Sequence, residues 1–412
     1  MIDGYVAPGF EAVREEFARN FAERGDVGAA VAVMVDGETV VDLWGGYADE
    51  AQTRPWERDT MVNVWSAGKP WSAISVLRLV ERGLVELDAP VARYWPEFAA
   101  AGKAELPVRY VLAHSAGLPA VRKNAASRGC NVTDWDGMCA ALAEQEPWWE
   151  PGTAFGYHTN TFGFLAGEIV RRVDGRSVGR YIREEIGEPL DADIYVGFGA
   201  EHDHRVAEWM QYQPPPDAES QRPWLEKDPA TVDGIDLARI QAYRNPPPLD
   251  DAGVNTRTWR AAEYPSTNPH ATARGLAKVH AALARGGELD GYRLLQPETI
   301  ELANTIQSDG EDVILGRPNR FGLGFQLTIP GVRTLGHGPR NFGHYGNGGI
   351  IAFSDPDARM GFAYVLNAGG RSWRDPRNIA LIDAAYSGLA KDQLRQWRSR
   401  AHRANLLGGM SR

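Results

Sequence analysis

Strand-like segments at both ends of the chain constrain its fold more strongly than any other feature. Apolar runs and alternations typical of β-strands cover residues 27–35, 38–44, 321–328, 349–354 and 361–367. Asp36-Gly37 joins the first two segments, and Asp-Gly between apolar stretches is a strong hairpin signal. Because the strand patterns cluster at the two ends, we expect both ends to share one antiparallel sheet, with the residues between them inserted as a second unit.

The middle of the chain shows helical spacing instead. Apolar residues recur at helical intervals over residues 10–24, 69–82, 108–114, 133–144, 162–173, 178–186, 271–284 and 377–389. The predicted class is α/β of the α+β type, with a central antiparallel sheet flanked by helices and an inserted, mostly helical domain. We assign residues 1–88 and 305–412 to the α/β domain and residues 89–304 to the inserted domain; in an alternative assignment, part of residues 190–255 returns to the α/β domain.

Composition narrows the possible partners. The chain has 43% hydrophobic and 24% charged residues, which is ordinary for a globular protein. Its net charge of -10 argues against nucleic acid as a partner and against long-range steering of anions. The N-terminus lacks a basic segment followed by an apolar run, and no stretch approaches about 18 uninterrupted apolar residues. We expect a cytoplasmic protein that does not interact with membranes; the sequence does not indicate its oligomeric state.

Ser66-Ala67-Gly68-Lys69 is the principal candidate for chemistry. A serine hydroxyl is a weak nucleophile near neutral pH, and a lysine one helical turn later can lie close enough to take its proton. The segment leads into an apolar helical pattern, so the partial positive charge of a helix N-terminus would stabilise an alkoxide and help to lower the lysine pKa. The alternative is an exposed Ser/Lys pair of no catalytic importance, because this spacing also arises by chance.

Two later segments could complete such a site. Tyr157 precedes the predicted helix at residues 162–173, and a tyrosinate would become more accessible beside a lysine cation. The glycine-rich stretch at residues 341–353 lies beside a strand pattern, so a backbone N–H of Gly346 or Asn347 could form an oxyanion hole with that of Ser66, and His344 could contact substrate. The alternatives are a core tyrosine beside a surface His158, and a simple glycine-rich hairpin.

Several other motifs carry less weight. Gly175-Arg176-Ser177-Val178-Gly179 matches a nucleophile elbow, but it follows a helix rather than a strand, so Ser177 is predicted to cap the next helix. His114 is expected to hold loop structure. The histidines form no pair at metal-binding spacing, and we expect neither a metal nor a cofactor. Cys130 and Cys139 are expected to be reduced.

The ordered segments resemble the class C β-lactamase and penicillin-binding-protein superfamily, and most closely the family VIII carboxylesterases. Residues 112–119, 156–159, 164–168 and 266–274 also resemble stretches of that family, so the similarity runs from about residue 27 to residue 367. It implies a β-lactamase-like fold, with Ser66 as the acylated nucleophile, Lys69 assisting its deprotonation and Tyr157 as general base or proton shuttle.

Two departures from the superfamily affect substrate choice. Thr159 stands where lactamases carry an asparagine, and His344 stands where they carry a lysine; the resemblance implies that both positions contact substrate. Losing that amide and that cation removes a carbonyl-binding group and a carboxylate partner, which favours small neutral esters over β-lactams. Acyl transfer, amide hydrolysis or weak β-lactam hydrolysis would use the same acyl-enzyme and stay open as alternatives, as does a catalytically silent binding module.

Overall fold

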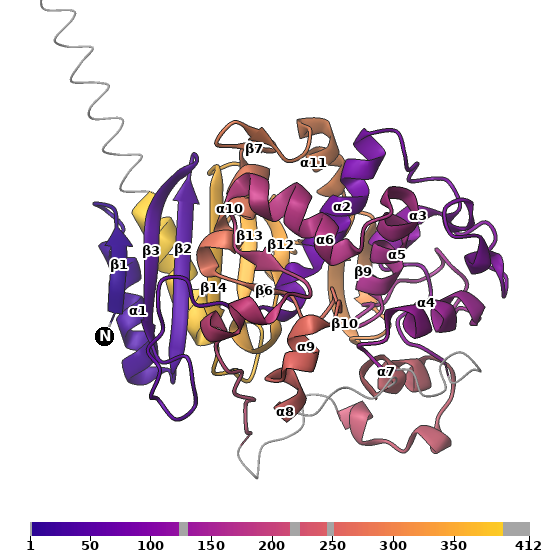
Figure 1. The fold of residues 1–412 in the computed structure, drawn as a ribbon, viewed down its shortest axis with the longest axis horizontal. Coiled ribbons are helices and arrows are strands. Elements are labelled where there is room, and N and C mark those ends of the chain that lie inside the picture. Colours follow the sequence, from indigo (N-terminus) through magenta and orange to yellow (C-terminus); the bar gives the residue numbers. More distant parts are fainter. Residues whose placement is uncertain (1, 123–130, 215–222, 245–250, 390–412) are drawn as a thin grey trace, which may run out of the picture.

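Both ends of the chain contribute to one nine-stranded antiparallel sheet in the order β1-β3-β2-β14-β13-β12-β11-β10-β9 (Figure 1). The computed structural model describes residues 2–122, 131–214, 223–244 and 251–389. The strands are β1 (Ile2–Val6), β2 (Gly28–Val35), β3 (Glu38–Gly46), β9 (Ser308–Asp312), β10 (Arg317–Phe321), β11 (Gln326–Leu327), β12 (Phe342–Tyr345), β13 (Ile351–Asp355) and β14 (Met360–Leu366). The ends meet where β2 pairs with β14, with Val31 opposite Tyr364. The predicted fold class is confirmed.

The hairpin between β2 and β3 has the predicted turn. Asp36 and Gly37 adopt φ angles of 52° and 89°, and Val35 pairs with Glu38 across the turn. Two successive residues with positive φ match the twist of the flanking strands, which is why Asp-Gly is preferred there. This local signal could be detected in the sequence because it depends only on neighbouring residues.

Other strands escaped prediction or differ in their bounds. β9 and β10 consist largely of polar residues, and β1 is a short edge strand. The predicted strand at residues 321–328 is broken between β10 and β11. There Gly324 has a φ of 82° and comes so close to α2 that an added Cβ would lie 2.1 Å from the Cβ of Ala73. Residues 322–325 therefore form a hairpin turn between two paired strands, with Phe321 opposite Gln326.

The labelled helices are α1 (Glu11–Glu23), α2 (Lys69–Glu81), α3 (Val108–Leu112), α4 (Trp135–Glu144), α5 (Phe162–Asp174), α6 (Val178–Ile182), α7 (Gly234–Arg244), α8 (Asp251–Val254), α9 (Arg257–Ala261), α10 (Ala273–Ala284) and α11 (Pro297–Ala303). Residues 376–389 are helical as well, which confirms the helix predicted over residues 377–389. In Figure 1, α10 crosses in front of the sheet. The helical segment predicted over residues 178–186 is confirmed, although its second half is a π-helical turn at Arg183–Gly187 that continues α6 without a break. Every residue of β14 is buried, as expected of a central strand with both faces covered.

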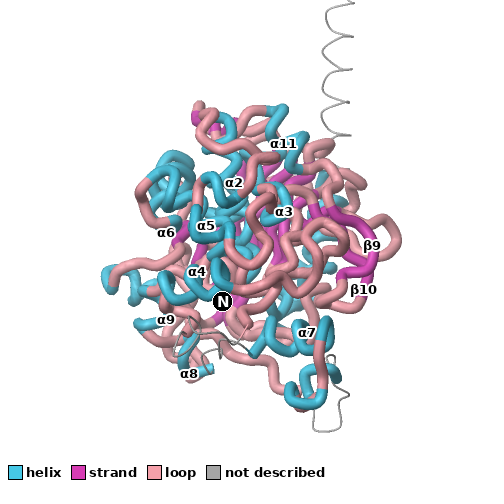
Figure 2. The backbone as a smooth tube through the Cα atoms, turned by 90° about the vertical axis from the view of Figure 1, so that its right-hand side faces the viewer, coloured by secondary structure: helices cyan, strands magenta, loops and turns pink. Residues whose placement is uncertain are grey.

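The helical part lies beside the sheet, with α3, α4 and α5 on the side seen in Figure 2. A small sheet of β4 (Val62–Asn63), β6 (His270–Ala271) and β5 (Ile194–Tyr195) ties three distant segments together. β4 ends three residues before Ser66, so this pairing fixes the approach to the candidate nucleophile. The predicted domain boundaries stay a prediction.

Two further observations concern the described residues only. Cys139 lies buried on α4 and forms no disulfide there, while Cys130 falls outside the described part of the chain. Among these residues, no helix combines the length and the apolar character required to cross a bilayer.

Candidate active site

Ser66 lies in a 3₁₀ turn, η1 (Trp65–Gly68), that runs directly into α2 at Lys69. Trp65 adopts a φ of 53°, a left-handed conformation that is unusual for a bulky residue and that marks local strain. Ser66 is half-buried, whereas Lys69 is completely buried. The sequence expectation of a serine at the start of a buried helix therefore has a counterpart in the structure, with a tight turn in place of the first helical turn.

Lys69 has an environment that favours a neutral amine. Its Nζ lies 3.0 Å from Ser66 Oγ and donates to the carbonyl oxygen of Ser266 at 2.7 Å. No acidic side chain forms an ion pair with it among the described residues. Burial therefore lowers the pKa of Lys69 well below its usual range, because the charged form loses its hydration without gaining a counter-ion. A neutral amine beside a serine hydroxyl can accept its proton.

Tyr157 faces the same pair of residues. Lys69 Nζ lies 5.0 Å from the centre of the Tyr157 ring, which stacks on Phe321 with 6.0 Å between ring centres. Tyr157 Oη is buried and completes no hydrogen bond within the described chain. Burial raises the pKa of Tyr157, and the nearby Ser66 hydroxyl offsets only part of that rise.

The expectation of an accessible tyrosinate is therefore not met. It assumed a lysine cation beside the phenol, whereas burial lowers the pKa of Lys69 and raises that of Tyr157. Burial thus favours the neutral form of both groups, in which the phenol of Tyr157 carries a proton and the amine of Lys69 has a free lone pair.

Asp312, at the end of β9, positions the Tyr157 loop. Its carboxylate oxygens accept from the Tyr157 N–H at 3.0 and 3.1 Å and from Asn319 Nδ2 at 2.9 Å. The N–H groups of Ile314 and Leu315 donate to it at 3.0 and 2.9 Å. Sequence reasoning missed this residue, because it belongs to a polar stretch typical of an exposed loop.

Two histidines complete the support of this loop. His158 Nε2 accepts from the Leu118 N–H at 3.0 Å, while its Nδ1 lies 2.7 Å from the Gly156 carbonyl oxygen. His114 Nδ1 accepts from the His158 N–H at 3.1 Å. His158 is buried, so the alternative of a surface residue is wrong, and burial lowers its pKa to about 4. Both rings serve the loop conformation, as expected for His114.

His344 lies on β12, with its ring centre 5.8 Å from that of Tyr157. Its Nδ1 is 2.6 Å from the carbonyl oxygen of Tyr345, and since that oxygen only accepts, Nδ1 carries the proton. Nε2 is buried without a partner in the described structure. Burial lowers the pKa of His344 well below its usual range. His344 is thus a neutral side chain and supplies no cation at this position.

Asn347, three residues after His344, offers a backbone donor for an oxyanion hole. The Gly346 N–H donates to the Ile350 carbonyl oxygen at 2.7 Å, which leaves Asn347 as the alternative for an oxyanion hole. Within the described part of the chain, the N–H groups of Asn347 and Ser66 have no acceptor. Asn347 is exposed and begins the turn η9 (Asn347–Gly349).

Thr159 turns back toward its own loop. Its N–H donates to the Tyr157 carbonyl oxygen at 2.8 Å, and its Oγ1 lies 3.4 Å from the same oxygen. Asn160, one position later, donates to the Ala242 carbonyl oxygen at 2.9 Å and accepts from Thr267 Oγ1 at 3.1 Å. Position 159 therefore lacks the lactamase asparagine, but the adjacent Asn160 ties the Tyr157 loop to two other segments.

Tryptophans form an aromatic cluster beside the nucleophile. The ring of Trp65 lies 5.1 Å from that of Trp209 and 6.3 Å from that of Trp259. Trp135, in contrast, packs against Phe164 and donates to Glu168, as part of the helical core. The tryptophans of the middle segment therefore divide between the surroundings of Ser66 and the core.

Ser177 acts as a helix cap. Its Oγ accepts from the Arg180 N–H at 3.3 Å and donates to Glu263 Oε1 at 2.5 Å. The preceding helix ends at Gly175 with a φ of 88°. The prediction that Ser177 caps the next helix is confirmed.

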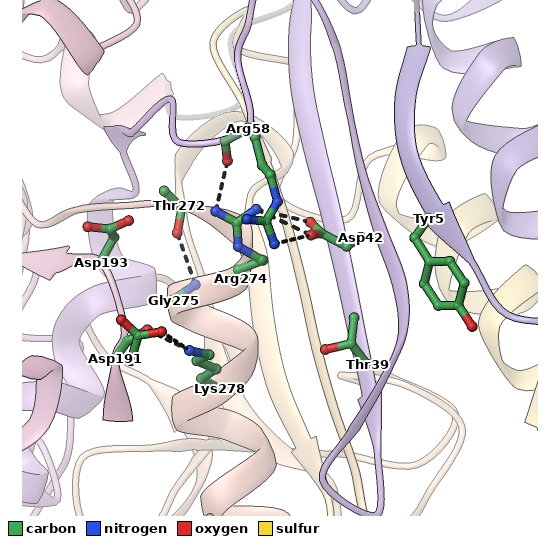
Figure 3. Close-up of a pocket in the computed structure, with 10 residues that line it drawn as sticks. All are labelled: Tyr5, Thr39, Asp42, Arg58, Asp191, Asp193, Thr272, Arg274, Gly275 and Lys278. Carbon is green, nitrogen blue, oxygen red and sulfur yellow. Dashed lines mark hydrogen bonds and ion pairs between the residues drawn. The ribbon is translucent and has the colours of Figure 1, made fainter. Parts of the chain in front are cut away.

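A surface cavity of about 460 Å³ lies elsewhere, between β3 and α10 (Figure 3). Its lining includes ion pairs between Asp42 and Arg274 and between Asp191 and Lys278, which satisfy its charges internally. None of the candidate catalytic residues lines it. In the described ranges, no group of three or more His, Cys, Asp or Glu side chains could hold a metal ion.

This chain is similar to several known proteins in sequence and in fold. A model of the beta-lactamase family matches residues 17–387. The crystal structure of a family VIII carboxylesterase is 40% identical with a TM-score of 0.84, covering 94% of this chain and all of that one. A penicillin-binding protein homologue from Caulobacter crescentus is 38% identical with a TM-score of 0.83 over 94% of this chain and all of its own. The esterase/beta-lactamase LipL of Mycobacterium tuberculosis is 36% identical over 377 residues, which are 88% of this chain and 82% of that protein.

Proposed function

The chain belongs to the β-lactamase family of serine hydrolases, and from that premise we propose that it hydrolyses carboxylic esters through an acyl-enzyme on Ser66. The resemblance to family VIII carboxylesterases noted in the sequence is confirmed. The names of the carboxylesterase and of LipL support ester chemistry for this chain as well.

One observation carries the proposal: the Lys69 amine lies 3.0 Å from the Ser66 hydroxyl, and burial favours its neutral form. As Ser66 Oγ attacks the ester carbonyl, its proton passes to Lys69 Nζ. The N–H groups of Ser66 and Asn347 stabilise the negative charge that develops on the carbonyl oxygen.

Collapse of the tetrahedral intermediate releases the alcohol and leaves the acyl group on Ser66. Tyr157 Oη gives its proton to the departing alkoxide, and the ammonium of Lys69 returns a proton to the phenolate. Water then attacks the acyl-enzyme, with the same two groups removing a proton from it and returning one to Ser66 Oγ. Each turnover consumes one water and leaves the enzyme in its starting protonation state.

The neutral state of His344 supports ester over β-lactam chemistry. The superfamily lysine that it replaces would present a cation beside β12, whereas burial holds the imidazole uncharged. Thr159 directs its hydroxyl toward the backbone of its own loop and supplies no amide. The groups that hold a β-lactam in the lactamases thus have no counterpart at these two positions.

The test compares Ser66→Ala with Ser177→Ala on p-nitrophenyl butyrate. Ser66→Ala should abolish turnover, and a serine-reactive phosphonate should add its mass to the wild type but not to this variant. Ser177→Ala removes a helix cap, so it should lower stability by about 1 kcal/mol and leave turnover intact. Wild-type turnover in Ser66→Ala, or adduct formation at another residue, would refute the mechanism.

A further inference from the structure

Arg333 presents a buried guanidinium without a hydrogen-bond partner near the candidate active site. It lies between β11 and β12, where its N–H donates to the Ile329 carbonyl oxygen at 2.8 Å in a tight turn. The residue is 6% exposed, and both Nη1 and Nη2 lack an acceptor in the described structure. No acidic residue forms an ion pair with it among the described residues.

The surroundings of Arg333 are cationic and aromatic. Its Cζ lies 5.0 Å from the ring centre of Trp373, and the Cζ of Arg317 lies 3.6 Å from the same ring. The ring of Tyr345, which ends β12, is 5.4 Å from Trp373. Two guanidinium groups therefore gather around one indole, next to the strand that carries His344.

The charge of Arg333 reaches the catalytic groups. Burial raises the pKa of Tyr157 and of Tyr345, and the charge of Arg333 opposes part of that rise; burial lowers the pKa of His344, and the same charge adds to that fall. Burial first, and the charge of Arg317 second, lower the pKa of Arg333 to about 10, so the guanidinium stays charged near neutral pH.

Asp312 does not neutralise this cation. It is the carboxylate whose charge acts on Arg333, but it already accepts from the N–H groups of Tyr157, Ile314 and Leu315 and from Asn319. A buried charge without a partner is costly, and a guanidinium presents donors that match both oxygens of a carboxylate. An anionic group on a ligand would satisfy donors that the protein leaves open.

We propose that Arg333 binds a carboxylate of the substrate, so that the preferred substrates are esters that carry a free carboxylate on their acyl or alcohol portion. This inference depends on the proposed ester hydrolysis. It replaces the neutral substrates expected from the loss of a lysine at position 344, since Arg333 packs on Trp373 beside Tyr345, the residue that follows His344 on β12. The net charge of -10 disfavours long-range steering of such anions, but recognition at contact depends on local charge.

The test uses pairs of esters that differ only by methylation of the carboxylate. For the acyl side these are p-nitrophenyl hydrogen glutarate and its methyl ester; for the alcohol side, 4-acetoxybenzoate and its methyl ester. In one of the two pairs, the kcat/KM of the wild type should be at least about tenfold higher for the ester with the free carboxylate, which identifies the side that Arg333 binds.

Arg333→Met should bring that ratio close to 1, and Arg333→Lys should retain part of it. Arg320→Met is the matched control, because Arg320 pairs with Asp309 at 2.8 Å and should leave the ratio unchanged.

The outcomes separate this inference from the proposed function. If all the esters are hydrolysed but neither free carboxylate is preferred, the inference is wrong and the esterase proposal stands. If no ester is hydrolysed, the proposed function itself fails. An equal loss of both rates in Arg333→Met would make Arg333 a positioning residue for Tyr157 and overturn the inference. Should Arg333→Met not fold, inhibition of the wild type decides: glutarate should compete with p-nitrophenyl butyrate and dimethyl glutarate should not, while equal inhibition by both would overturn the inference.

Discussion

Lys69 Nζ lies 3.0 Å from Ser66 Oγ, and no acidic side chain in the described part of the chain forms an ion pair with that amine. The carbonyl oxygen of Ser266 accepts its other hydrogen bond. Because a carbonyl oxygen neutralises no charge, burial dominates and lowers the pKa of the amine. The absence of a nearby counter-ion thus favours the neutral form of this amine, the form that can accept the proton of Ser66.

Replacing Lys69 by Met should lower kcat for p-nitrophenyl butyrate by a factor of about 10² to 10⁴, the usual contribution of a positioned base. Methionine keeps an unbranched chain in the buried position, so the melting temperature should change little. Lys103→Met is a matched control, because Lys103 is also completely buried and donates to the carbonyl oxygens of Ala100 and Ala143 at 2.8 and 3.0 Å. An unchanged kcat in Lys69→Met would remove lysine from the mechanism.

The pH dependence of kcat/KM should have an acid limb and no alkaline limb up to about pH 9. Only the neutral amine of Lys69 accepts a proton, so activity is lost as the pH falls through its pKa, which burial holds well below the usual range. Burial raises the pKa of Tyr157, so the phenol stays protonated over this interval. The measurement is initial rates of p-nitrophenyl butyrate hydrolysis, corrected for the spontaneous reaction. A rate that climbs without a plateau toward the pKa of an ordinary lysine would contradict the assignment.

Local signals in the sequence predicted the parts of the site that local structure determines. Ser66 and Lys69 are one turn apart, so helical geometry alone brings them together. Ser177 could be assigned to a cap because Gly175 ends the preceding helix. Tyr157 and His344 lie in distant segments and were candidates from the character of those segments, but only the resemblance to a family gave Tyr157 its role, because spacing along the chain says nothing of such contacts.

Asp312 and Arg333 could not be identified from the sequence, because the importance of each follows from its burial in the folded chain. Asp312 belongs to a strand whose three central residues are exposed, so the stretch carries the composition of a loop. Arg333 is a lone arginine in a turn, and arginines are almost always exposed unless paired. The expected tyrosinate failed for the same reason, since the protonation states of Lys69 and Tyr157 follow from burial rather than from their being neighbours.

Asp312→Asn should impair catalysis through Tyr157. One acceptor oxygen becomes an NH₂ group facing N–H donors, so we expect stability to fall by about 1 to 3 kcal/mol and kcat by about tenfold or more as the loop shifts. Tyr157→Phe keeps the ring that stacks on Phe321 and should lower kcat by about 10² to 10⁴.

The double variant shows whether the two residues act together. If Asp312 works by placing Tyr157 Oη, Asp312→Asn should cost little further kcat once Tyr157 is Phe, although its effect on the melting temperature should persist. Losses of kcat that multiply in the double variant would mean that Asp312 acts on another part of the site.

Gly348→Ala should disable the oxyanion hole without touching a catalytic side chain. Gly348 follows Asn347 with a φ of 68°, and an added Cβ would lie 2.7 Å from Gly369 Cα and 2.8 Å from the ring of Trp209. Because these neighbours are backbone and a packed indole, the turn must move and carry the Asn347 N–H with it. We expect kcat to fall by about 10² to 10³, the cost of losing one oxyanion donor.

Gly83→Ala is the control, since Gly83 has a φ of 70° with nothing within 4 Å of the added Cβ. Both variants should lose about 1 to 2 kcal/mol of stability from the left-handed backbone, but only Gly348→Ala should lose kcat. Equal kcat in the two variants would separate the Asn347 turn from the chemistry.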